Sequence, residues 1–545
     1  HRDSQLKGPG AKPTSPHAMF RKRGKAYDEA TIPKDKRLRR NLADLYLSND
    51  VSAARAQSLF ADAVGAKVSN CADLAAVGDG GRIPNNMARD LKRRLLKGSK
   101  WPKPYVASVR TWNDKTEKEV VSKIPILLPH EIVWKIMEDS STAEFLLGQE
   151  LGNQDENHLR SVCKELGIRR GQTLGVGLWG DGVPYNYDRS ASLDVFSLNI
   201  PGFHDGRFEN MRIPLFAIDH SHVVKGTTFD GLMEILAWSF QFLAAGVHPS
   251  VRHDGSPFEP KNDKDRAKSA ASPSPFRAVL VECRGDWKQL KDVFRFPQFN
   301  ELAGMCWMCK CTPDTWRDVG ADASWRSQRL DHWGFVERLR RRKLQPSPLF
   351  GCPGLTTSCF KPDWLHVVDL GVTCDFLGNL LLLLSTKFEG RSHKARVAAM
   401  WQHVQGWYRT LPVDVVTPLQ NLTTTMLQGS STKPPKLRAK AAQARGLVQY
   451  AVLAADVYLG GNDREDTAKA MAHELASRYA CLSHSEFSHE KLATHCQQYC
   501  LLAVAMEAAH DGVLWRCQPK LHLFQELAGV QKDCPSLFCP YRDEA

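Results

Sequence analysis

The sequence predicts an α/β protein whose β-β-β-α-β core follows a basic helical module and precedes a long helical region. Three observations predict this class. Strand-like apolar runs begin near residue 171, helical periodicity dominates after residue 371, and positive charge gathers in the first hundred residues. With 42% hydrophobic and 24% charged positions, the composition is that of a globular protein and excludes a disordered or fibrous chain.

The net charge of +13 is unevenly distributed. Residues 1–100 hold 21 Lys and Arg against 10 Asp and Glu, so nearly all of the excess lies there. A basic module of this kind indicates contact with a polyanion, of which nucleic acid is the commonest, although a solvated basic tail has the same composition.

The N-terminal third is predicted to have three parts. Residues 1–30 lack apolar periodicity and predict a disordered basic arm, residues 31–119 a basic helical module, and residues 120–170 a helical connector. Within the module, the segment Ala88–Leu96 reads as a basic helix and is the candidate DNA-binding element. Its candidate contacts, one of them just beyond the helix, are Lys92, Arg93, Arg94 and Lys97.

Residues 171–290 carry the predicted core. A helix is expected over Phe229–Ala245, after three consecutive strands and before a fourth that is apolar throughout and therefore buried on both faces. The four predicted strands are Thr173–Trp179, Ala191–Ile200, Arg212–Ile218 and Phe276–Cys283. This order is that of an RNase H-like fold.

Asp181 follows the first predicted strand and Asp286 follows the fourth. In an RNase H-like fold these strands are central neighbours, so the two carboxylates would repel each other unless cations lay between them. A pair of Mg²⁺ ions, or Mn²⁺, held there activates a nucleophile for phosphodiester chemistry. Taken singly, Asp181 and Asp286 are also explained by an ordinary turn or loop. Asp219 ends the third strand, which is an edge in this topology, and therefore ranks lower as a catalytic candidate.

At this point the chain resembles the DDE transposases of the CACTA and Plavaka type, as a truncated or domesticated member would. The resemblance covers roughly residues 170–545, and the order of the motifs carries it. These motifs are Leu178-Trp-Gly-Asp-Gly-Val-Pro184, Gly285-Asp286, Cys306-Trp-Met-Cys309, Pro362-Asp-Trp-Leu-His-Val-Val-Asp-Leu-Gly371, Pro519-Lys-Leu-His522 and Tyr541-Arg-Asp-Glu544.

The resemblance implies a helical insertion between the second and third acids, here residues 371–515, and a return to the core over residues 516–545. Helical patterns fill the insertion. By position the third catalytic acid, and third Mg²⁺ ligand, is Glu544, with Asp543 as the rival. The chain stops at Ala545, so a truncated closing helix is expected.

A zinc site is expected in residues 291–370. Cys306 and Cys309 have the spacing of two zinc ligands on one turn. The resemblance adds His366 through its Asp-x-x-His pattern, and Cys311, Cys352 and Cys359 remain alternatives. His522 is expected to contact DNA, to steady the active site or to pack in the core.

The leading hypothesis is a transposase-like enzyme that cleaves and transfers DNA strands at transposon ends, with homo-oligomerisation left open. The alternative is a catalytically silent, transposon-derived DNA-binding or scaffold protein. Fifteen thinly spread cysteines favour reduced thiols, and residues 1–30 lack a secretory signal. A nuclear or otherwise intracellular fragment is therefore expected. No membrane span is expected, since the longest unbroken apolar runs, such as Leu380–Leu384, are short.

Overall fold

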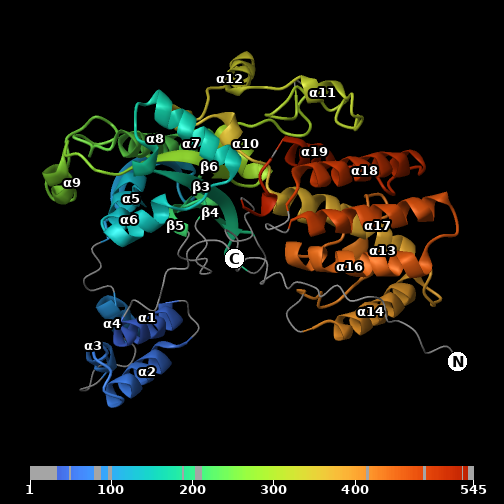
Figure 1. The fold of residues 1–545 in the computed structure, drawn as a ribbon, viewed down its shortest axis with the longest axis horizontal. Helices are drawn as coiled ribbons and strands as arrows, with labels where there is room; N and C mark the ends of the chain where they lie inside the picture. The colour runs from blue at the N-terminus through green and yellow to red at the C-terminus, as the bar shows by residue number, and fades with distance from the viewer. Residues whose placement is uncertain are drawn as a thin grey trace. The chain divides into compact units, whose positions relative to one another are not determined.

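The chain divides into two compact units, one over Gly24–Lys103 and a larger one from Pro104 onward (Figure 1). A computed structural model describes most of both units. The described residues are 33–47, 51–78, 87–95, 101–186, 190–202, 212–302, 304–412, 416–482, 487–530 and 532–537. The predicted arm, residues 1–30, lies outside them.

The smaller unit is helical in its described part, as predicted. Phe60, Leu74 and Leu91 are fully buried and join its helices in one small core. Its helices are α1 (Lys34–Leu47), α2 (Ala53–Gly65), α3 (Ala72–Ala75) and α4 (Met87–Leu95).

The larger unit opens with a hairpin that the sequence did not predict. Strands β1 (Tyr105–Asn113) and β2 (Lys118–Ile126) pair antiparallel, from Tyr105 opposite Ile126 onward. The predictions of a helical module up to residue 119 and of a helical connector from residue 120 are therefore wrong over the two strands of this hairpin. The inward side chains alternate along β1, with Tyr105 and Val109 buried, and this period of two is that of a strand.

The helical part of the connector follows the hairpin. It comprises α5 (Pro129–Met137), α6 (Ser140–Leu147) and α7 (Asn153–Glu165). A Pro at the first position of α5 and the Asp139 side chain capping α6 explain where these two helices begin.

A second sheet forms the centre of the larger unit in the order β5-β4-β3-β6. Strand β3 is antiparallel to β4 and parallel to β6, so the first and last strands of the predicted core are neighbours. The mixed α/β class is thereby confirmed. The strands are β3 (Thr173–Pro184), β4 (Ser192–Asn199), β5 (Arg212–Asp219) and β6 (Arg277–Arg284).

Helices cover both faces of this sheet. On one face Leu159 and Val162 of α7 pack with Val281 of β6. On the other, Val176 of β3 packs in the main core with residues of α8 (Thr228–Ala245), the helix that connects β5 to β6. A sheet buried on both faces explains the apolar sequence of β6.

The C-terminal half of the larger unit is a helical layer (Figure 1). Helices occupy most of residues 371–515, as the sequence predicted for the insertion, and α17 packs between α16 and α18. The long helices are α13 (Cys374–Ser385), α14 (His393–Thr410), α16 (Ala441–Tyr458), α17 (Asp463–Cys481), α18 (His489–Ala508) and α19 (Lys520–Val530). The remaining helices of the larger unit are shorter: α9 (Lys264–Ser269), α10 (Trp287–Phe294), α11 (Ser324–Ser327) and α12 (His332–Arg341) precede this layer, and α15 (Thr424–Leu427) lies within it.

The segment Leu365–Ser385 is a single long helical stretch that begins with π-helical backbone, η8 (Leu365–Thr373), and continues as α13. By length and apolar composition it is the one candidate for a membrane span in the described part of the chain, although the sequence suggested none. Within it, 78% of the apolar window is buried inside the protein. A core helix has the same character, so this is weak evidence for a membrane.

Candidate active site and metal centre

Asp181 lies near the end of β3, just past Trp179, where the pairing with β6 stops. The strand does not end at Trp179 as predicted, because its pairing with β4 continues to Pro184. The Asp181 carboxylate is half-buried, and its Oδ1 accepts a hydrogen bond of 2.7 Å from the backbone N of Gly182. This acid is therefore held at the centre of the sheet.

Asp286 follows β6 directly and caps the N-terminus of α10. Its Oδ1 accepts a hydrogen bond of 2.6 Å from the backbone N of Gln289. The preceding Gly285 lets this turn lie against β3, since a Cβ there would meet the carbonyl oxygen of Gly180 at 2.9 Å. Close backbone approach thus brings Asp286 beside the strand that carries Asp181.

The two carboxylates interact. Burial, and then the charge of Asp286, raises the pKa of Asp181 to about 6, while the charge of His366 opposes this shift and that of Asp363 adds to it. Repulsion of this kind is expected between acids that share one space without a cation. The predicted pair Asp181 and Asp286 is therefore brought together.

A third carboxylate of the described residues, Asp363, joins this site. It is buried, its Oδ1 accepts from the backbone N of His366 at 2.7 Å, and its Oδ2 lies 3.2 Å from Nδ1 of the same histidine. Lys520 donates from Nζ to the His366 carbonyl at 2.6 Å. Asp181, Asp286 and Asp363 are called the acidic cluster below.

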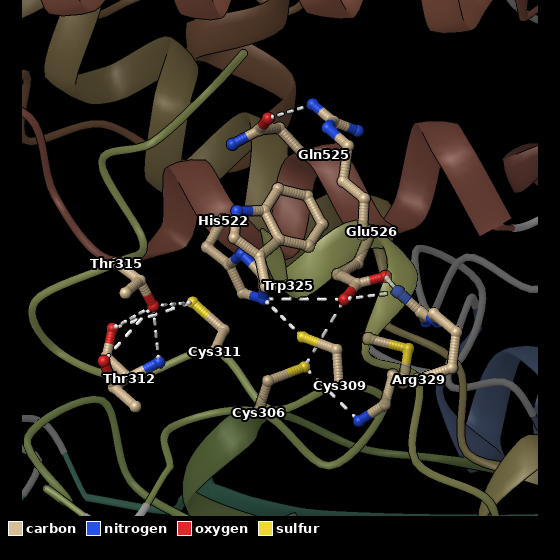
Figure 2. A network of polar contacts seen from close by, with 12 residues as sticks. Cys306, Cys309, Cys311, Thr312, Thr315, Trp325, Arg329, His522, Gln525 and Glu526 are labelled. Carbon is tan, nitrogen blue, oxygen red and sulfur yellow. Dashed lines mark hydrogen bonds and ion pairs between the residues drawn. The ribbon is translucent and has the colours of Figure 1, made fainter. Parts of the chain in front are cut away.

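A second group of side chains, the CCHE cluster (Cys306, Cys309, His522 and Glu526), is fully buried elsewhere in the larger unit, with all its ligand atoms within 4.8 Å of one another. His522 Nε2 lies 3.4 Å from Cys309 Sγ and 3.5 Å from Glu526 Oε1. Tetrahedral zinc, with bonds of about 2.0 to 2.3 Å, places its ligand atoms roughly 3.5 Å apart. The CCHE cluster fits a zinc ion (Figure 2).

Two elements build the CCHE cluster. The cysteines lie on a tight turn in which the backbone N of Met308 donates to Cys306 Sγ at 3.3 Å. His522 and Glu526 lie one turn apart on α19, where an i, i+4 pair shares one face. A metal here joins the loop after α10 to α19, two segments some two hundred residues apart in sequence.

The electrostatics of the CCHE cluster favour a cation. Burial, and then the nearby Cys309, raises the pKa of Glu526 to about 8, and burial raises the pKa of the Cys306 thiol. Arg329 donates from Nη1 to both carboxylate oxygens of Glu526, at 2.9 and 2.8 Å. Such an outer partner orients a ligating carboxylate.

The prediction of His366 as a zinc ligand is corrected. Its position three residues after Asp363 turns it toward its own helix cap and the acidic cluster, away from Cys306 and Cys309. Cys311 does not belong to the group of four: its Sγ accepts a hydrogen bond from Thr315 Oγ1 at 3.7 Å, although it also interacts with Cys309 (Figure 2).

The other sequence alternatives also lie elsewhere. Cys359 Sγ is 3.5 Å from His158 Nε2, and both Cys359 and Cys352 lie near Cys283. Among the described residues, the CCHE cluster is the one group that meets the geometric criterion for a metal site.

Sequence reasoning missed Glu526 as a candidate metal ligand, and it did not assign His522 to that role. The available signal was the His-x-x-x-Glu spacing on a helix far downstream of the Cys-x-x-Cys turn. It is a weak signal, because i, i+4 pairs are common on helices.

The remaining predicted site residues are the basic residues of the candidate DNA-binding helix and the two C-terminal acids. Lys92 and Arg93 are exposed on α4, whereas Arg94 donates to the Asp73 carbonyl and helps to hold the smaller unit together. Lys97, Asp543 and Glu544 lie outside the described residues.

Comparison with known proteins gives no match. No family model matches the chain, and no curated protein resembles it significantly. The function is therefore argued from the geometry of these two sites.

Proposed function

We propose that the chain is an RNase H-like, divalent-cation-dependent enzyme that cleaves and joins DNA phosphodiester bonds, as a DDE transposase does. The observation that carries this proposal is the placement of Asp181 and Asp286 at matching ends of adjacent parallel strands, with coupled charges. The strand order β5-β4-β3-β6, with β3 antiparallel to β4 and parallel to β6, supports it.

Asp181 and Asp286 are the residues that would hold Mg²⁺ or Mn²⁺. Hard carboxylate oxygens suit these ions, and the raised pKa of Asp181 reflects negative charge that a cation would compensate. When bound, the metal supplies an activated nucleophile and stabilises the leaving oxygen. Among the described residues, Asp363 is the candidate for the third carboxylate. Glu544 remains the candidate from the sequence.

His366 and Lys520 complete the site. Asp363 holds the imidazole of His366 in one orientation through Nδ1, and Lys520 places a positive charge where the phosphodiester would lie. An anionic substrate must approach three carboxylates that repel it, and the positive charge of Lys520 would offset part of this repulsion.

Zinc in the CCHE cluster has a structural role in this proposal. All four donors are fully buried, which is the character of a closed site with no open position for substrate. The ion would tie α19 to the loop after α10. Helix α19 begins at Lys520, and α10 begins directly after Asp286. Zinc would thereby hold two walls of the active site in register.

DNA is the proposed partner, and the nucleus the proposed location. The exposed Lys92 and Arg93 on α4 give the smaller unit a basic face that can contact phosphates.

The test is nicking of supercoiled plasmid by the full chain in Mg²⁺ or Mn²⁺. Asp181→Asn and Asp286→Asn are expected to abolish nicking and to leave DNA affinity nearly unchanged. Asp219→Asn is the matched control: its carboxylate ends the edge strand β5 and bonds Tyr185 and Ser221, so activity should persist. Nicking that survives Asp181→Asn would refute the assignment. A wild-type chain inactive with both metals would favour the silent DNA-binding or scaffold alternative.

A further inference from the structure

A cleft of about 700 Å³ lies beside the acidic cluster. Trp287, the residue after Asp286, and Lys520, which contacts His366, both line it. The rest of its wall comes from α10 and the segment after it, from the end of η8 and the start of α13, from the loop before α16, and from the segment before α19. The candidate active site and the cleft therefore share residues.

The cleft is strongly basic. Among the described residues that line it, Asp375 is the one carboxylate, and Lys436 pairs with it at 3.1 Å. The cationic lining residues are Lys288, Lys433, Lys436, Arg438, Arg516 and Lys520. Lys433, Arg438 and Arg516 have exposed side chains, so the wall presents positive charge to solvent.

Flat apolar surfaces lie between these charges. Phe299 is 52% exposed and meets Trp287 edge-on, with 6.2 Å between ring centroids. The Trp287 ring is fixed by its Nε1, which donates to the Pro297 carbonyl at 2.8 Å. Pro434 and Pro435 also line the cleft and restrict the backbone there. Large exposed aromatics are costly to leave in water, and they suit ligands with π-faces.

We propose that this cleft binds a single-stranded segment of nucleic acid. Phosphates would contact Lys433, Arg438 and Arg516, and a base would stack on Phe299, which is how strand-binding proteins combine a basic groove with aromatic platforms. A volume of about 700 Å³ is that of a small-ligand pocket, which accommodates a few nucleotides and not a duplex.

Given the proposed function, this strand is the one that leads to the phosphodiester at the acidic cluster. The two ideas are separable, because strand binding to the cleft needs no metal and no chemistry.

The test measures binding of a fluorescent mixed-sequence 12-nucleotide DNA strand to the full chain in EDTA, across a salt series. The triple variant Lys433→Ala/Arg438→Ala/Arg516→Ala is expected to lower the log–log salt slope by about 2, since each lost phosphate contact on a single strand contributes about 0.7. The control Arg341→Ala/Lys394→Ala/Arg464→Ala removes the same charge from exposed positions outside the cleft and should leave the slope unchanged.

The aromatic platform is tested separately. Phe299→Leu is expected to weaken strand binding by on the order of tenfold, and Phe299→Tyr to restore it, because stacking needs a ring and not merely an apolar side chain. Three results would each overturn the proposal. The first is that the Phe299 and triple variants lose as much affinity for duplex as for single strand; the second is an equal salt slope for the two triple variants. The third is competition by poly-glutamate as strong as that by the oligonucleotide. A chain that binds strands in EDTA but never nicks DNA would support the cleft and refute the enzyme; the reverse result would do the opposite.

Discussion

The CCHE cluster and the acidic cluster have opposite characters although both depend on α19. The CCHE cluster is fully buried and has soft sulfur and nitrogen donors, with its carboxylate anchored by Arg329. Asp181 and Asp286 are half-buried, offer hard oxygen donors and adjoin a basic cleft. A closed donor set suits a structural ion, whereas an open one leaves room for substrate. Two of the three carboxylates of the acidic cluster are therefore partly open, although Asp363 is buried, whereas all four donors of the CCHE cluster are closed off from solvent.

Both clusters nevertheless raise a carboxyl pKa for the same reason. Burial is the first cause at Asp181, whose pKa rises to about 6, and at Glu526, whose pKa rises to about 8. The second cause in each is a neighbouring acid, Asp286 or Cys309. A cation reverses both effects, so metal is expected to matter to each site in a different way: folding at one and chemistry at the other.

The largest effect is expected from Cys306→Ser. It should remove about one equivalent of zinc and lower Tm by ~10 °C or more, because a structural zinc site contributes on the order of 10 kcal/mol. Metal analysis and thermal unfolding of the purified chain measure both. The matched control is Cys311→Ser, whose sulfur lies in the same loop and contacts Thr315, and it should keep the metal. Zinc retained by Cys306→Ser would show that the cysteines do not bind it.

At the acidic cluster two variants of Asp286 separate chemistry from folding. Asp286→Asn should lower plasmid nicking by at least ~10³-fold, about 4 kcal/mol of barrier, with Tm unchanged because Asn also caps a helix. Asp286→Ala should lose the same activity and, in addition, ~1 kcal/mol of stability, since Gln289 N loses its acceptor. If both variants lost only stability, Asp286 would be a helix cap and nothing more.

The identity of the fourth zinc ligand is tested at Glu526. Glu526→His should retain zinc, since imidazole is a good ligand one turn from His522, whereas Glu526→Gln should weaken zinc binding by about 10- to 100-fold. Competition with a chromogenic chelator measures both affinities. Equal affinities for the wild type and Glu526→Gln would leave zinc with three protein ligands and would open the site.

The smallest effect concerns Asp369, a buried carboxylate that belongs to neither cluster but is influenced by the charge of Asp363. Burial raises the pKa of Asp369 to about 7, so the native state holds a proton that the unfolded chain releases above its ordinary pKa of 3.8. Wild-type stability should therefore fall as pH rises from about 4 to 7. Asp369→Asn imitates the protonated form and keeps an acceptor for Tyr479.

Relative to the wild type, the Tm of Asp369→Asn should rise by a few degrees between pH 4.5 and pH 8 and stay level above that. Asp219→Asn serves as the control, because hydrogen bonding to Tyr185 holds the pKa of Asp219 below its usual range. A Tm difference independent of pH would mean that Asp369 is ionised in the folded protein.

Local pattern predicted the elements that bear the acidic pair. The alternation in β4, the unbroken apolar run of β6 and the helical spacing of α8 follow from side-chain period and burial, which adjacent residues already encode. The adjacency of β3 and β6, and with it the meeting of Asp181 and Asp286, was expected from the RNase H-like folds that share this element order, and the two strands do pair. The hairpin β1–β2 was missed because its solvent-facing side chains dilute the apolar signal.

By itself, then, the sequence determined the strands and their order along the chain, the position of two acids and one half of a candidate metal site, the Cys306–Cys309 turn. Only the tertiary structure decided that α19 supplies the other half and that His366 belongs with Asp363 instead. The physical reason is separation along the chain: spacing encodes contacts within one turn or one strand pair, whereas contacts across some two hundred residues depend on how whole helices pack.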